Sequence, residues 1–156
     1  MLIALARRMP EKNFLAVLGF QGKLPLEQGP PNVTYIPFVP DIRTVYAELG
    51  ILIMPSDYES WGRVGLEAMC SGIPVIAHPT PGLVESLSYA GLFCDRDRVE
   101  DWVQTIRSLE DPRFYREVSE KCIRRSRELD PAGSLQSFGN FVNKILNSHP
   151  SEKSGG

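Results

Sequence analysis

Short apolar runs recur along the first two thirds of the sequence, and they constrain the fold more than any other feature. Each run is four or five residues long, rich in branched side chains and nearly continuous in its apolar character. Runs of this kind are typical of strands that are buried on both faces of a sheet. The strands predicted in this way are residues 14–18, 33–36, 51–54, 74–77 and 91–94.

Helical patterns separate several of these strands. Ile42, Val45 and Leu49 have the spacing of one inward-facing helical surface. Asp41 precedes them as a capping residue, and residues 62–71 are also helical in pattern. An alternation of strand and helix is typical of a parallel sheet covered by helices. The sequence therefore predicts the α/β class, with a Rossmann-like parallel sheet and flanking helices.

Beyond Cys94 the pattern is helical, with a break at residues 130–133, which include Pro and Gly. The length of 156 residues suits a single domain. We expect that domain to cover residues 1–147 and to be followed by a flexible tail over residues 148–156, where apolar periodicity is lost. The helices predicted after Cys94 are residues 98–109, 112–129 and 134–146.

The charge balance argues against nucleic acid as a partner. Lys and Arg number 17 against 19 Asp and Glu, which gives a formal net charge of −2. A protein that binds a duplex needs a basic face to displace counterions from the phosphates.

Basic residues do gather in the predicted helix over residues 112–129, and these could favour an anionic membrane surface. Glutamates interspersed among them favour a solvated helix face instead.

The cysteines and the apolar runs indicate a cytoplasmic protein without a bound metal. Cys70, Cys94 and Cys122 are 24 and 28 residues apart, which matches no paired metal-ligand spacing, so we expect reduced thiols. Cys70 stands among small residues and is expected to be buried. The longest apolar run falls far short of the ~18 residues that cross a bilayer. Basic residues follow the apolar start of the chain, the reverse of a secretory signal.

Two glutamates follow the third predicted strand, eight residues apart. Glu59 falls in the loop after the strand, and Glu67 falls inside the next helix. In open parallel sheets, ligands bind beyond the carboxyl ends of the strands. A carboxylate accepts two hydrogen bonds side by side, which suits the paired hydroxyls of a ribose or a hexose. Glutamate is also a good helix former, so the spacing alone leaves an exposed helix residue as the alternative.

The residues around this pair resemble the Glu-x7-Glu region of the retaining glycosyltransferases of the two-domain GT-B fold. The resemblance is to the glycosyltransferase group 1, or family 4-like, enzymes and covers roughly residues 1–127. A second matching segment places Gly82 and Glu85 where the family has a glycine turn that leads into a helix. The residues of the first segment that match in order are Glu59, Trp61, Gly62, Leu66, Glu67, Ala68, Met69, Gly72, Pro74 and Val75.

The resemblance implies that the chain is the carboxyl-terminal, donor-binding half of such an enzyme. Glu67 would bind the ribose hydroxyls of a nucleotide-sugar donor, and Glu59 would contact the transferred sugar as the catalytic carboxylate. The implied reaction transfers a hexose from the donor to a sugar, lipid or small acceptor with retention of anomeric configuration. By the same resemblance it requires no metal, and it requires no separate cofactor because the nucleotide sugar is itself the substrate.

The same resemblance assigns the remaining donor contacts. Gly82 and Leu83 would offer backbone N–H groups to the diphosphate at the start of a helix. Phe38 and Val39 would lie beside the nucleotide base. Arg63 either faces the phosphates, to which arginine gives forked hydrogen bonds, or is a solvated helix residue.

Two parts of the family pattern have no counterpart in this sequence. Family members have a strand before the position of Met1, followed by a loop whose arginine and lysine neutralise the diphosphate, and they have a second domain that holds the acceptor. In a sheet of order 3-2-1-4-5-6 the absent strand would be central, and its neighbours would lack a partner. We therefore expect this chain alone to be an incomplete and inactive half. The alternative is a non-catalytic module that binds nucleotide sugars or other proteins.

Overall fold

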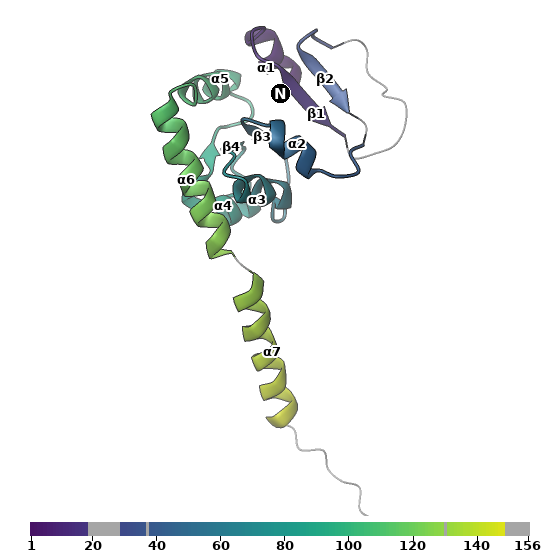
Figure 1. The fold of residues 1–156 in the computed structure, drawn as a ribbon, viewed down its shortest axis with the longest axis vertical. Helices are drawn as coiled ribbons and strands as arrows, with labels where there is room; N and C mark the ends of the chain where they lie inside the picture. Colours follow the sequence, from purple (N-terminus) through teal and green to yellow (C-terminus); the bar gives the residue numbers. More distant parts are fainter. Residues whose placement is uncertain (19–28, 37, 130, 149–156) are drawn as a thin grey trace, which may run out of the picture. The chain divides into compact units, whose positions relative to one another are not determined.

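The computed structural model describes residues 1–18, 29–36, 38–129 and 131–148. The chain divides into two compact units, Met1–Ser126 and Arg127–Gly156 (Figure 1). The first unit holds both sheets and most of the helices, and the second holds the last helix, α7 (Pro131–Ser148). Residues 149–156, the larger part of the expected tail, lie outside the described residues.

The first sheet is a parallel pair that follows helix α1 (Leu2–Arg8). Strand β1 (Phe14–Val17) pairs with β2 (Val33–Ile36) in a register that sets Phe14 against Val33. The Asn32 side-chain amide lies within 2.8–3.1 Å of the carbonyl oxygens of Ala6, Met9 and Lys12 and donates to them. Because a helix end leaves carbonyl groups without intrahelical partners, this one amide joins the end of α1 to the start of β2.

The second sheet has three parallel strands in the order β3-β4-β5: β3 (Leu52–Met54), β4 (Val75–Ala77) and β5 (Leu92–Phe93). All three residues of β4 are buried, as expected for a central strand covered by helices on both faces. The parallel α/β architecture predicted from the sequence is confirmed.

The two sheets are separate within the described residues. There, β1 pairs with β2 and β3 pairs with β4, and no ladder joins β1 to β3. Strands β1 and β3 are less buried than β4, and Val17 in β1 is 37% exposed.

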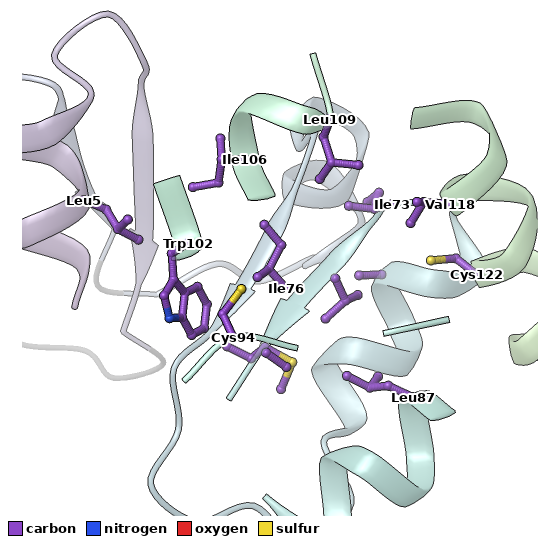
Figure 2. Close-up of a cluster of buried hydrophobic side chains, with 14 of the residues drawn as sticks. Leu5, Ile73, Ile76, Leu87, Cys94, Trp102, Ile106, Leu109, Val118 and Cys122 are labelled. Atoms are coloured by element: carbon purple, nitrogen blue, oxygen red, sulfur yellow. The ribbon is translucent and has the colours of Figure 1, made fainter. Parts of the chain in front are cut away.

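One hydrophobic core nevertheless serves both sheets. It includes Phe14 from β1 and Met54 from β3. Trp102 is fully buried, and its indole N–H donates to the carbonyl of Asp95 at 2.8 Å. Figure 2 shows Trp102, Leu5 of α1 and Ile76 of β4 among the side chains of this core. Besides α1 and α2 (Arg43–Glu48), the helices that contribute to this core are α3 (Arg63–Cys70), α4 (Pro81–Leu87), the 3-10 turn η1 (Ser88–Ala90), α5 (Val99–Ser108) and α6 (Pro112–Glu128).

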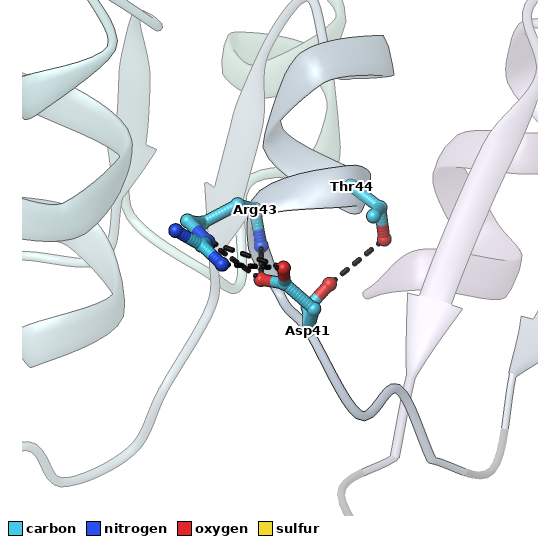
Figure 3. Close-up of polar contacts among 3 residues, drawn as sticks. All are labelled: Asp41, Arg43 and Thr44. Carbon is cyan, nitrogen blue, oxygen red and sulfur yellow. Dashed lines mark hydrogen bonds and ion pairs between the residues drawn. The ribbon is translucent and has the colours of Figure 1, made fainter.

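Helix α2 (Arg43–Glu48) differs from its prediction in which residue faces inward. The carboxylate of Asp41 accepts the backbone N–H of Arg43 at 3.1 Å and also pairs with the Arg43 guanidinium, so the helix begins at Arg43 (Figure 3). Ile42 therefore precedes the helix and is 36% exposed, whereas Tyr46 is 8% exposed. The buried residue of α2 is Tyr46.

Two further expectations are corrected by the structure. Helix α7 begins at Pro131, inside the predicted break, because proline is tolerated in the first turn of a helix. Cys70 is exposed, because α3 buries Gly65, Ala68 and Met69 instead.

The other two cysteines, Cys94 and Cys122, are buried free thiols. No helix in the described part of the chain has the length and apolar character that crossing a membrane requires.

The basic residues of α6 are partly used inside the fold. The Arg125 guanidinium donates to the carbonyl oxygens of Ser86 and Glu85 at 3.0 and 2.9 Å, at the end of α4. Lys121 pairs with Glu117 at 2.7 Å, one turn away. Cations at the end of a helix stabilise its free carbonyl groups, so Arg125 has a structural role.

Candidate functional site

The loop between β3 and α3 lies directly against the start of α4. Gly62, at φ +69°, has the left-handed conformation that glycine adopts without strain, and a Cβ atom there would overlap the Leu83 side chain. A Cβ atom at Gly82 would overlap the backbone carbonyl oxygens of Glu59 and Ser60. These two glycines let the backbone that carries Glu59 approach the first turn of α4. The structure therefore brings the loop that contains Glu59 against Gly82 and Leu83, which the resemblance assigns to one donor site.

Glu67 is held at both carboxylate oxygens. The Tyr46 hydroxyl donates to Oε2 at 3.0 Å, and Arg63 Nε donates to Oε1 at 3.2 Å. The Glu67 side chain is 37% exposed and that of Arg63 is 87% exposed. The Arg63 side chain is therefore exposed to solvent and at the same time paired with the Glu67 carboxylate. Burial, followed by the hydrogen bond to the carboxylate of Glu67, raises the pKa of Tyr46 well above its usual value.

The start of α4 already uses one of its backbone donors. Thr80 is the N-cap of this helix, and its hydroxyl accepts the Leu83 N–H at 3.3 Å. Pro81 follows as the first helical residue, where its missing N–H costs nothing. Gly82 and Leu83 are both buried, and the Leu83 N–H is the one engaged by the cap.

Phe38 and Val39 belong to a different part of the fold. They follow the carboxyl end of β2 in the first sheet, and Phe38 is 45% exposed. Glu59 and Gly82 follow β3 and β4 in the second sheet.

Sequence reasoning missed a polar link across the carboxyl ends of the second sheet. Asp57 follows β3, His78 follows β4 and Arg96 follows β5. The Arg96 guanidinium pairs with the Asp57 carboxylate, and the Arg96 backbone N–H donates to His78 Nδ1 at 3.2 Å. The ion pair between Arg96 and Asp57 connects the loop that contains Glu59 to the segment after β5.

The contact between Tyr46 and Glu67 is the second feature that was missed. Tyr46 is four residues beyond Ile42, so it lies on the apolar face that Val45 and Leu49 suggested, but its side chain ends in a hydroxyl. No group of three His, Cys, Asp or Glu side chains suited to a metal ion occurs among the residues that the structure describes.

Comparison with known proteins identifies the family. The sequence model of the family described as "Glycosyl transferases group 1" matches residues 22–129, more than half of the chain. The chain belongs to this family. The match includes Glu59, Glu67 and Gly82, so it covers the whole of the site described above.

Relatives of this group 1 chain carry glycosyltransferase names. It is 36% identical over 126 residues to "D-inositol 3-phosphate glycosyltransferase" of Mycobacterium sp. (strain KMS), covering 76% of this chain and 29% of the relative. It is 33% identical over 93 residues to "Sulfoquinovosyl transferase SQD2" of Arabidopsis thaliana, covering 56% of this chain and 18% of the relative. The chain spans less than a third of the length of the curated relatives that it matches.

Solved structures share the fold. Sucrose-phosphate synthase from Thermosynechococcus elongatus superposes with a TM-score of 0.78 at 22% identity, over 95% of this chain and 42% of the other. Anabaena Alr3699/HepE in complex with UDP and glucose gives a TM-score of 0.66 at 22% identity, over 72% of this chain and 32% of the other. The group 1 chain therefore has the architecture of part of a longer glycosyltransferase fold.

Proposed function

We propose that this chain is the donor-binding domain of a retaining glycosyltransferase. As part of a larger enzyme, it would transfer a hexose from a nucleoside-diphosphate sugar to a sugar, lipid or small acceptor. The observation that carries the proposal is the close approach of the Glu59 loop to Gly82, because it sets the backbone of Glu59 against the first turn of a helix. A sugar diphosphate needs both features, one for hydroxyl groups and the other for negative charge.

The two glutamates take different parts of the donor in this proposal. Glu67 binds the ribose hydroxyls, since a carboxylate accepts two hydrogen bonds from a vicinal diol. Glu59 contacts the transferred sugar and acts as the catalytic carboxylate. The contribution of the chain is to position the donor and to stabilise the charge of the departing diphosphate, without a metal or a cofactor.

The diphosphate lies at the start of α4 in this proposal, with the backbone N–H groups of Gly82 and Leu83 as donors. Leu83 would share its proton between Thr80 and a phosphate oxygen. Arg63 is exposed and donates to Glu67 through Nε, and its other guanidinium N–H groups would turn towards the phosphates. Phe38 and Val39 would contact the base.

Two observations on other proteins support a nucleotide-sugar donor. The Anabaena structures that share this fold were solved with UDP and glucose and with UDP-glucose. The matched relatives are named as transferases of sugars. The acceptor and the complete reaction belong to the whole enzyme, of which the matched region is a part.

Ligand-detected NMR with UDP, GDP and ADP tests the donor site on the chain itself. We expect a preference for one nucleotide, which Glu67→Ala weakens about tenfold or more, because a hydrogen bond to a charged group is lost. Glu59→Ala should leave the free nucleotide unaffected and weaken only the matching nucleotide sugar. Glu117→Ala, on the exposed surface of α6, removes the same charge and should change neither.

Equal losses for Glu59→Ala and Glu67→Ala would contradict the division of roles. Failure of a folded chain to bind any of the three nucleotides would contradict a working donor site in these 156 residues. Binding of a nucleotide sugar without transfer to any acceptor, when the chain is joined to an acceptor domain, would favour the non-catalytic module instead.

A further inference from the structure

The Glu67 carboxylate is hydrogen-bonded to two side chains that differ in their exposure to solvent. On one side the Tyr46 side chain is 8% exposed and its hydroxyl donates to Oε2 at 3.0 Å. On the other side the Arg63 side chain is 87% exposed and its Nε donates to Oε1 at 3.2 Å. One partner is fixed by the fold, and the other extends into water.

The tyrosine partner is fixed because α2 and the core hold its ring. Tyr46 is the buried residue of α2, and that helix is anchored at its start by the Asp41 and Arg43 contacts of Figure 3. The hydroxyl has a second acceptor in reach, the Val64 carbonyl at 3.4 Å. Its single proton is better used on the closer and charged oxygen of Glu67, because charge-assisted hydrogen bonds are the stronger ones.

The arginine partner is loose. It is an exposed pair between residues four apart on one helix, and such pairs contribute little because water and salt compete with them. An incoming ligand can replace Arg63 on Oε1 without disturbing the fold, whereas replacing Tyr46 would require α2 to move. The carboxylate therefore offers Oε1, together with the second lone pair of Oε2, to a ligand.

We infer that Tyr46 is a positioning residue, which fixes the Glu67 carboxylate in the orientation that receives the vicinal hydroxyls of a ribose. The inference rests on the proposed function, because it concerns the ribose contact of Glu67. Because the Tyr46 hydroxyl already holds Oε2, the carboxylate is ordered before the ligand arrives. Less side-chain entropy is then lost on binding, and this preorganisation increases affinity. Tyr46 itself contacts no part of the ligand.

The test compares each nucleotide with its analogue that lacks the ribose hydroxyls. UDP, GDP and ADP are titrated by NMR, and the tightest binder is then paired with its 2′,3′-dideoxy form. The ratio of the two dissociation constants measures how much the diol contributes. We expect a ratio of about tenfold or more in the wild type, and a ratio near one in Glu67→Gln, because the amide is a weaker acceptor.

Tyr46→Phe keeps the buried ring and removes only the hydroxyl. We expect this variant to bind the dideoxy form as tightly as the wild type does. Its ratio of dissociation constants for the dideoxy form and the natural nucleotide should fall most of the way to one. Tyr115→Phe is the matched control, since the Tyr115 hydroxyl donates to the Gly50 carbonyl at 2.9 Å and not to Glu67. That control should keep the wild-type ratio. In the background of Glu67→Gln, Tyr46→Phe should change the ratio no further, because Tyr46 acts through Glu67.

The outcomes separate the inference from the function on which it rests. If Glu67→Gln removes the ratio and Tyr46→Phe keeps it, the inference about Tyr46 is wrong and the donor site stands. If the wild type binds no nucleotide, or if Glu67→Gln leaves the ratio unchanged, the proposed ribose contact is wrong and the inference falls with it. A loss of affinity in Tyr46→Phe that is equal for both ligands would show a structural role alone and would also overturn the inference.

Discussion

The two sheets of the first unit contrast in their burial and in the residues that their loops carry. Every residue of β4 is buried, the loops after β3 and β4 carry Glu59 and His78, and Gly82 lies in the first turn of α4. In β1 only Phe14 is buried, and the sheet that it forms with β2 is joined to α1 through the side chain of Asn32. The fold therefore places the closely packed part of the site on the sheet that contains its best-buried strand, β4.

The largest effect should come from breaking the central strand. Ile76 in β4 is fully buried, so Ile76→Ala removes a branched side chain from between two layers of helices. We expect it to lower the free energy of unfolding by about 3 kcal/mol, which urea denaturation would measure. Leu15→Ala, in half-buried β1, should cost only about 1 kcal/mol by the same principle. Equal losses at the two positions would mean that the sheets do not differ as their burial indicates.

Gly82→Ala should have a smaller but more specific effect. The added Cβ would overlap the carbonyl oxygens of Glu59 and Ser60, so the loop and α4 must separate. We expect a loss of about 2 kcal/mol, in the range for overpacking, with amide NMR shifts concentrated in residues 57–62. Gly139→Ala is the control, because its added Cβ meets no atom within 4 Å. It lies within α7 and should stabilise that helix by up to about 1 kcal/mol.

Asn32→Ala sharpens the contrast between the sheets by acting on one of them. The amide of Asn32 serves the carbonyl groups of Ala6, Met9 and Lys12, and its removal leaves them to water. We expect about 1–2 kcal/mol of destabilisation, because the site is only partly buried and water can replace the amide. Hydrogen exchange should become faster in β1 and β2 while β4 keeps its protection. A uniform increase across both sheets would mean that they open as one unit.

The sequence indicated the strands and the glutamate pair because those signals are local. A continuous apolar run needs only its own residues to be recognised, and the eight-residue separation of Glu59 and Glu67 fixes one in a loop and the other on a helix. The Tyr46 contact depends instead on the position at which α2 begins. Ile42 falls outside that helix, and the inward direction moves to Tyr46. The Arg96–Asp57 pair joins segments that only the tertiary fold brings together, so no local pattern could predict it.

Labelling of the cysteine thiols perturbs the folded protein least of these tests, and the labelling rates of the buried thiols report how tightly the second sheet and its helices pack. Cys122 is fully buried beside the carbonyl of Ala90, and burial raises its pKa to about 11. Cys94, at the end of β5, is also buried, and its pKa is raised mainly by burial. Cys70 is exposed at the end of α3. Since the thiolate is the reactive form, a thiol with a raised pKa reacts more slowly at any pH below that value.

Mass spectrometry after brief treatment with iodoacetamide at pH 8 should therefore find Cys70 modified while Cys94 and Cys122 stay free. The rates at the two buried thiols should rise in Ile76→Ala, because that substitution loosens the sheet that covers them, and should stay unchanged in Asn32→Ala. Denaturant is the positive control, since unfolding exposes all three thiols alike. Fast labelling of Cys122 in the folded wild type would show that the second sheet opens readily, and the contrast between the sheets would then lie in their static burial alone.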